Sequence, residues 1–278
     1  MDAQHVKSPA RSSNYDTSAG KALALLDAFI GPRSILGVSE LASLAQLPKS
    51  TAFRLLNALV LCGYLHRVGD QYSLSDRVFE VGSHTRMARP HGLRDRAMPF
   101  MAELFGQTRQ TIHLAVLAGT DVLYLEKLYG HESLRLGTAV GGRRPAYATA
   151  LGKAMLAFAE QEPADWCRRI RYHRFTAYTI VSPELMKQSL TRVHDEGLAF
   201  DSEESMLGVA CVAVPILNAR NGRAIAALSM STPVGNGSAR RFTKALANAA
   251  EQLSTQLTPF VNDGPVTAAR PSALSTHP

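Results

Sequence analysis

The chain has few cysteines, and none of them stands in a spacing typical of a metal site. Its 278 residues hold three, at positions 62, 167 and 211. An odd number without a Cys-x-x-Cys pair excludes a framework of disulfides and predicts a reducing environment. No stretch approaches the roughly 18 uninterrupted apolar residues of a membrane span, and residues 1–18 lack the apolar core of a signal peptide. We therefore expect a soluble, cytoplasmic protein without a bound metal.

The short motifs of common catalytic sites are missing as well. Neither Gly-x-Ser-x-Gly nor His-Glu-x-x-His occurs, and the nine histidines are scattered without metal-ligand spacing. Gly152-Lys153 resembles the end of a phosphate-binding loop, but Tyr147 stands where that loop needs its first glycine, and Ala154 follows the lysine in place of Ser or Thr. We expect no enzyme and no cofactor; a metabolite-binding enzyme is the alternative.

The charge of the chain favours an anionic partner. The formal net charge is +7 and the sequence pI is about 9.5. The first 96 residues hold 12 Lys and Arg against 8 Asp and Glu, so the N-terminal third is the more basic part. Such a balance is compatible with nucleic-acid binding but does not specify a fold. A non-specific nucleic-acid-binding protein is a further alternative, although it would not need a large second domain.

Length and local composition predict two domains with polar ends. Residues 1–17 and 263–278 are aperiodic and rich in small and polar residues, which predicts disordered tails. Arg89-Pro90-His91-Gly92 marks a break in the chain. We expect a helical domain at 18–75, a linker helix at 76–92 and a mixed α/β domain at 93–262.

The first domain has the pattern of a helix-turn-helix followed by a hairpin. Apolar residues at helical spacing predict a first helix from Ser18 that stops at Gly31-Pro32. Ser39 is expected to cap a second helix, and a third runs from Pro48 to about Cys62. A hairpin over 64–74 with a Gly-Asp turn completes a winged helix-turn-helix.

The third helix is predicted to carry a polar face that fits the major groove of DNA. On such a helix Arg can read guanine, Asn can read adenine, and Ser, Thr and Lys can hold phosphates. A solvated face on an ordinary surface helix would look the same, but the surrounding unit favours DNA. The candidate contacts, two of them on the hairpin, are Lys49, Ser50, Thr51, Arg54, Asn57, Arg67 and Tyr72.

The second domain alternates helices with paired strands. Adjacent strands joined by tight turns predict an antiparallel sheet with helices packed on it, which makes the whole chain α+β. The expected strands are Thr111–Ala118, Val122–Leu128, Leu134–Thr138, Ala210–Leu217 and Ala224–Ser231, and the expected helices are Arg94–Gln107, Thr149–Ala159, Pro163–Ile170, Pro183–Glu196 and Ser238–Leu257.

Three segments together resemble the IclR family of bacterial transcriptional regulators. They are ELASLAQLPKSTAFRLLNALVLCGYL at 40–65, RRPAYATALGKAMLA at 143–157, and EGLAFDSEESMLGVACVAVPI with GRAIAALSMSTP between 196 and 233. The resemblance covers roughly residues 18–260. It implies a winged helix-turn-helix joined by a linker helix to a GAF-like effector domain, and a regulator of a catabolic operon controlled by a small organic acid.

The resemblance also implies the effector site. Physically, the helix start at 149–152 offers N–H groups suited to a carboxylate, and two serines two positions apart share one side of a strand. A buried cysteine and strand serines are often only structural. The effector-binding residues that the resemblance implies are Tyr147, Ala150, Leu151, Gly152, Asp201, Val209, Cys211, Ser229 and Ser231.

One position suggests the kind of effector. Tyr147 stands where many family members have His, which resembles the branch regulating aromatic-acid catabolism, although Gly152-Lys153 differs from the Gly-Arg frequent there. We expect an aromatic or dicarboxylic acid. We also expect a homodimer or tetramer, with the helix from Asp76 to Met87 as its contact, acting on double-stranded operator DNA as a repressor or an activator.

Overall fold

The structure, a computed structural model, describes residues 17–31, 33–85, 92–130, 136–235 and 238–257. The chain divides between residues 85 and 86 into two compact units, each described here by itself. The expected linker helix starts at Asp76 in the N-terminal unit but ends at Ser83, with His84 as its C-cap, so it is shorter than predicted; residues 86–91 lie outside the described residues. Within the described ranges, no helix is both long enough and apolar enough to cross a membrane.

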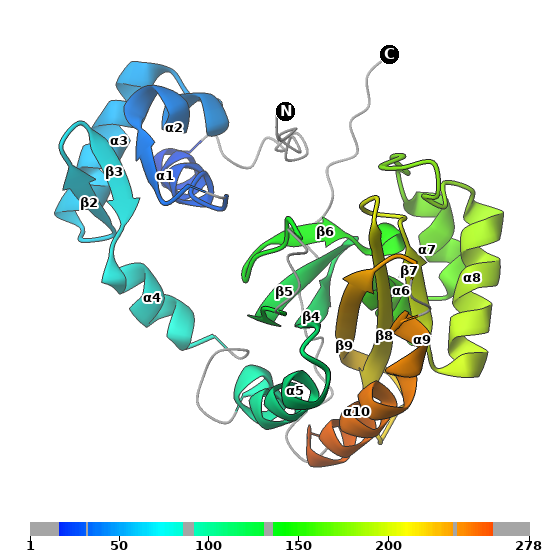
Figure 1. The fold of residues 1–278 in the computed structure, drawn as a ribbon. Coiled ribbons are helices and arrows are strands. Elements are labelled where there is room, and N and C mark those ends of the chain that lie inside the picture. Colours follow the sequence, from blue (N-terminus) through cyan, green and yellow to red (C-terminus); the bar gives the residue numbers. More distant parts are fainter. Residues whose placement is uncertain (1–16, 32, 86–91, 131–135, 236–237, 258–278) are drawn as a thin grey trace. The chain divides into compact units, whose positions relative to one another are not determined.

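Over its described residues, the N-terminal unit consists of four short helices and a three-stranded antiparallel sheet (Figure 1). In chain order its elements are α1 (Ser18–Asp27), β1 (Ile35–Gly37), α2 (Val38–Leu44), α3 (Lys49–Leu61), β2 (Leu65–Val68), β3 (Gln71–Leu74) and α4 (Asp76–Ser83). The predicted hairpin is confirmed as β2 and β3, with β1 paired on the other side of β3. The short β1 was not predicted.

The helix boundaries follow local chemistry with small shifts. Gly37, not Ser39, is the N-cap of α2, because the helix already begins at Val38; the capping prediction for Ser39 was wrong. Pro48 is the N-cap of α3 instead of its first residue. Gly63 follows α3 with a φ of +77°, a left-handed conformation that favours glycine and ends the helix as predicted. The apolar sides of α1, α2 and α3 meet in one core.

The C-terminal unit is a six-stranded antiparallel sheet covered by helices on both faces. Its helices are α5 (Leu93–Thr108), the 3-10 turn η2 (Ala146–Ala148), α6 (Ala150–Leu156), α7 (Pro163–Arg169), α8 (Pro183–Glu196), α9 (Ser238–Arg241) and α10 (Thr243–Leu257). Its strands are β4 (Thr111–Ala118), β5 (Asp121–Leu128), β6 (Arg143–Pro145), β7 (Ala199–Ser202), β8 (Val209–Leu217) and β9 (Ala224–Pro233), in the spatial order β6-β5-β4-β9-β8-β7.

Two cores, one on each face of this sheet, hold the unit together. Helices α6 and α8 pack on one face and α5 and α10 on the other (Figure 1). Along β4 the side chains alternate between the two, so that Ala115 belongs to the first core and Leu114 and Val116 to the second. The central strands are therefore buried on both faces, which explains their long apolar runs.

Three details differ from the sequence-based expectations. Residues 136–138 belong to no strand, contrary to the strand expected at Leu134–Thr138, whose first two residues lie outside the described ranges. Strands β6 and β7 were not predicted. The expected C-terminal helix is interrupted near Phe242, where α9 ends and α10 begins.

Candidate functional site: a nucleic-acid interface and a ligand pocket

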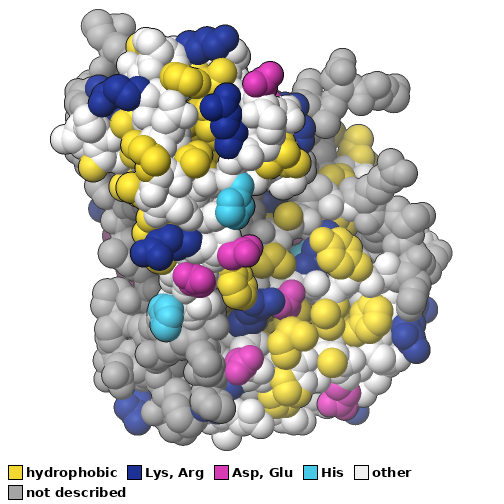
Figure 2. All heavy atoms as spheres, turned by 90° about the vertical axis from the view of Figure 1, so that its left-hand side faces the viewer, with side chains coloured by type: hydrophobic (Ala, Val, Ile, Leu, Met, Phe, Trp, Pro, Cys, Tyr) yellow, Lys and Arg dark blue, Asp and Glu magenta, His cyan; other side chains and the backbone are white. Residues whose placement is uncertain are grey.

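Helix α3 presents the predicted polar face to solvent. Its buried side consists of Ala52, Leu55 and Leu56, which pack into the N-terminal core. Figure 2 shows Lys and Arg side chains standing apart from one another on the N-terminal unit, in the upper part of the view, with hydrophobic side chains between them. The exposed predicted contacts on α3 are Lys49, Ser50 and Arg54, and the half-buried ones are Thr51 and Asn57.

The two hairpin residues differ sharply in exposure. Arg67 is exposed on β2, and its Nε donates a hydrogen bond of 3.1 Å to the carbonyl oxygen of Gly69, which orients the side chain along the turn. Tyr72 on β3 is only 1% exposed and belongs to the N-terminal core. Tyr72 was wrongly predicted as a DNA contact, because alternation along β3 turns its ring inward.

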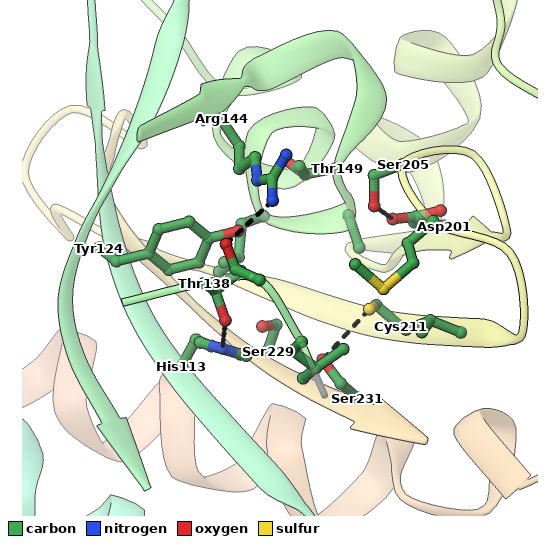
Figure 3. A pocket seen from close by; sticks show the side chains of 16 residues that line it. His113, Tyr124, Thr138, Arg144, Thr149, Asp201, Ser205, Cys211, Ser229 and Ser231 are labelled. Carbon is green, nitrogen blue, oxygen red and sulfur yellow. Dashed lines mark hydrogen bonds between the residues drawn. The ribbon is translucent and has the colours of Figure 1, made fainter. Parts of the chain in front are cut away.

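A pocket lies in the C-terminal unit (Figure 3). Strands β4, β5, β8 and β9 and the start of α6 form most of its wall. The segment before β6 and the segment between β7 and β8 complete it. The pocket encloses about 490 Å³ of empty space, with the open solvent at its mouth included. The lining residues are His113, Tyr124, Leu136, Gly137, Thr138, Arg144, Thr149, Ala150, Leu151, Asp201, Ser205, Met206, Val209, Cys211, Ser229 and Ser231.

The structure brings most of the predicted effector residues together in this pocket. They come from α6, β7, β8 and β9, elements up to 81 positions apart in the chain. The predicted residues that line it are Ala150, Leu151, Asp201, Val209, Cys211, Ser229 and Ser231. Tyr147 and Gly152 do not line it, and both have a structural explanation.

Tyr147 faces a different part of the unit. Its hydroxyl accepts a hydrogen bond of 2.6 Å from the backbone N–H of His173 and donates one of 2.8 Å to the carbonyl of the same residue. Its ring packs against Tyr172 and Phe175. The side chain therefore anchors the segment after α7, and the prediction that it contacts the effector does not fit this placement.

Gly152 is required by packing at the start of α6. A Cβ at this position would lie 2.0 Å from the carbonyl oxygen of Ala146, far inside contact distance. Its N–H donates to the Oγ1 of Thr149, the N-cap of α6, over 3.0 Å. The N–H groups that the helix leaves without an internal partner at the pocket are those of Ala150 and Leu151.

Polar side chains that sequence reasoning missed complete the lining. His113 lies directly opposite Ser229 in the pairing of β4 with β9, and its Nε2 is 2.9 Å from the Oγ1 of Thr138 (Figure 3). Tyr124 on β5 and Arg144 on β6 add a phenol and a guanidinium. No local pattern marks these residues, because strand register and pairing bring them to the pocket.

Three buried titratable groups of the pocket, His113, Tyr124 and Cys211, are uncharged at neutral pH. Burial, assisted by the charge of Lys127, lowers the pKa of His113 to about 3. Burial and the nearby Asp201 raise the pKa of the Cys211 thiol to about 12, and burial also raises the pKa of Tyr124. The thiol lies 3.2 Å from the hydroxyl of Ser231. The pocket thus offers neutral donors and acceptors on these sides.

A buried ionic network supports the opposite wall. Lys153 on α6, only 2% exposed, pairs with Glu204. Asp201 accepts hydrogen bonds from the Glu204 N–H at 2.8 Å and from the Ser205 hydroxyl at 3.0 Å. Burial raises the pKa of Asp201, and Lys153 opposes that shift. These contacts hold the segment after β7 against the pocket.

Comparison with known proteins gives the same family over both units. A model described as "IclR helix-turn-helix domain" matches residues 18–69, and one described as "Bacterial transcriptional regulator IclR C-terminal" matches residues 85–255. The chain is 33% identical to the HTH-type transcriptional regulator KdgR of Escherichia coli over 247 residues, which cover 87% of this chain and 92% of KdgR. It is 35% identical to XynR of the same organism, over 85% of this chain and 92% of XynR.

Solved structures agree with these sequence matches. An IclR homologue from Microbacterium hydrocarbonoxydans, crystallised with 4-hydroxybenzoate, is similar with a TM-score of 0.79 and 28% identity, over 87% of this chain and all of that chain. The Thermotoga maritima IclR is similar with a TM-score of 0.70 and 26% identity, over 87% of this chain and 98% of that one. The predicted α+β fold is confirmed by these structures.

Proposed function

The chain belongs to the IclR family of bacterial transcriptional regulators, and from this premise we propose that it controls a catabolic operon in response to a small organic acid. It is an effector-controlled, DNA-binding regulator. The single observation that carries this function is the match of both family models, in order, to the two units of the chain. Related regulators include both repressors and activators, so the sign of regulation is not part of the proposal.

Operator DNA is proposed to bind through α3 and the hairpin. The α3 side chains of Lys49, Ser50 and Arg54 are exposed opposite a buried apolar side, as a helix lying in the major groove requires. Thr51, Asn57 and the exposed Arg67 complete the contact set. Arg54 and Asn57 are the proposed base readers, and the remaining residues hold phosphates.

The pocket of the C-terminal unit is proposed to bind the organic acid. A Pseudomonas putida relative, 28% identical over 92% of this chain, is named as the regulatory protein of the Pca regulon, and an Acinetobacter baylyi relative, 32% identical, as the p-hydroxybenzoate hydroxylase transcriptional activator. These names and the 4-hydroxybenzoate in the Microbacterium structure support an aromatic acid. A dicarboxylic acid is the second candidate class from the sequence.

The assembly is proposed to be a homodimer or tetramer that acts in the cytoplasm, where the chromosome lies. Two helix-turn-helix units related by a twofold axis would read the two halves of a pseudo-palindromic operator. The relatives named above are regulators, so catalysis has no support among them. That the chain is not an enzyme stays a prediction.

A footprint tests the proposal. The purified full-length protein is incubated with DNA upstream of its own gene and of the neighbouring genes, at two salt concentrations, because phosphate contacts make affinity strongly salt-dependent. A protected site with twofold sequence symmetry, weaker at the higher salt, is expected. Absence of protection on all these fragments, even at low salt and with candidate acids present, would contradict a role as their regulator.

A further inference from the structure

Two ionisable side chains, Arg144 and Asp201, line different parts of the pocket. Arg144 reaches in from β6, and Asp201 stands at the far side, on β7 (Figure 3). The Nη2 of Arg144 donates a hydrogen bond of 2.9 Å to the carbonyl oxygen of Gly137. In the described part of the chain no carboxylate lies within ion-pair distance of Arg144. Its other N–H groups are therefore available to a ligand.

Hydroxyl groups stand in the same pocket. Tyr124 is 5% exposed, and its hydroxyl points toward the space beside the Arg144 guanidinium (Figure 3). Ser229 is 2% exposed, on the His113 side. Neither hydroxyl makes a hydrogen bond to another described residue, and neither is among the buried side-chain atoms that lack a partner, so both are open to the pocket. A ligand in the pocket can therefore bond to both.

The cation beside Asp201 is already neutralised. Lys153 is paired with Glu204, and the Asp201 carboxylate faces the pocket beside them. Burial raises the pKa of Asp201, so an anion on this side is disfavoured. A neutral hydroxyl or carbonyl would instead find the Ser229 and Ser231 hydroxyls and the Cys211 thiol.

Resting on the proposed function, we propose that Arg144 and the Tyr124 hydroxyl bind the carboxylate of the effector, and that the pocket selects monocarboxylic acids with a neutral polar group at the other end. Guanidinium forms charge-assisted, often bidentate hydrogen bonds to a carboxylate. Dicarboxylic acids are rejected because their second carboxylate would lie beside Asp201, where burial disfavours an anion and the nearby Lys153 is already paired with Glu204. His113 does not offset that cost, because its low pKa keeps the imidazole neutral.

Titration calorimetry with matched probes on the full-length protein tests this selectivity. One set is 4-hydroxybenzoate, its neutral amide 4-hydroxybenzamide and the diacid terephthalate; the other is lactate, lactamide and malate. In at least one set the wild-type protein is expected to bind the monoacid about tenfold or more tightly than the amide and the diacid. The proposal would be overturned if, in every set whose monoacid binds, the diacid binds as tightly as the monoacid, or if neither monoacid binds.

Substitutions then test which residue causes the preference for the acid over the amide. Arg144→Gln is expected to abolish the acid-over-amide preference, and Arg144→Lys, which keeps the charge without the bidentate geometry, to give an intermediate value. The matched control is Arg143→Gln, because Arg143 is exposed, adjacent and absent from the lining. A preference that persists in folded Arg144→Gln would refute the assignment. Protection of DNA in the footprint does not depend on which end of an acid Arg144 binds, so its outcome separates failure of this proposal from failure of the regulatory function.

Discussion

The start of α6 can pack against Ala146 only because residue 152 is a glycine without a Cβ. We predict that Gly152→Ala lowers the free energy of unfolding of the C-terminal unit by about 3 kcal/mol or more, because the new Cβ would collide with the backbone of Ala146. Chemical denaturation followed by circular dichroism measures this. The control is Gly106→Ala in α5, where a Cβ meets nothing within 4 Å, and a change of at most about 1 kcal/mol is expected. Equal stability of the two variants would show that α6 can shift away from Ala146.

His113 makes stability depend on pH. Its pKa is about 3 in the folded protein against 6.5 in an unfolded chain, so between these values only the unfolded state takes up the proton. The free energy of unfolding should therefore fall as the pH drops from about 7 toward 4.5. Lys127 on β5 adds to the shift, while Tyr124 and Thr138 face the ring as neutral groups.

The variant His113→Gln separates the contribution of His113 to the pH dependence of stability from that of the carboxylates. Between pH 7 and 4.5 wild-type protein is predicted to lose about 2 kcal/mol more stability than His113→Gln, which does not titrate there. Urea unfolding at both pH values gives the two differences. If wild type and variant lose the same amount, His113 is already accessible to protons in the folded state.

At the scale of elements, α4 stands out because none of its residues is buried. Phe79 is 75% exposed and Val81 55%, and Val78 is half-buried. Exposed apolar residues on a short helix of this kind are typical of a contact with another chain. This supports the proposed role of α4 in the dimer.

An oligomeric-state measurement tests α4 directly. Phe79→Glu is predicted to shift the protein from dimer or tetramer toward smaller species, because it would bury an unpaired charge in the contact. Light scattering after size exclusion gives the mass. Glu80→Gln, a polar neighbour on the same helix, is the control and should keep the wild-type mass. A Phe79→Glu protein of unchanged mass would place the contact elsewhere, and a monomeric wild type would contradict the proposed assembly.

At the scale of the whole molecule, two units with separate cores predict separable functions. Arg54→Ala should weaken operator binding about 10- to 100-fold, the loss expected for one base-reading arginine, while binding of the acid stays unchanged. Fluorescence anisotropy on the footprinted site and calorimetry with the bound acid measure both. Arg192→Ala removes one exposed charge from α8 and is the control for the lost charge itself. Loss of acid binding in Arg54→Ala would argue against separable units.

The sequence by itself determined the features that depend on near neighbours. The helical spacing of Ala52, Leu55 and Leu56 separates the buried from the polar side of α3, and Gly63 ends that helix because its conformation requires a glycine. The order of two domains and their family also follow from local segments. Helix faces, caps and turns involve residues within a few positions of one another, so a linear pattern suffices to predict them.

Only the tertiary structure decided the composition of the pocket. His113 meets Ser229 through the register of β4 on β9, across 116 positions of chain, and Arg144 reaches the same space from an edge strand too short to predict. Tyr147 and Tyr72 stood in predicted sites, yet packing turned one toward His173 and the other into a core. Strand register and the choice between two buried sides depend on contacts between distant segments, and a one-residue change of register would exchange the faces.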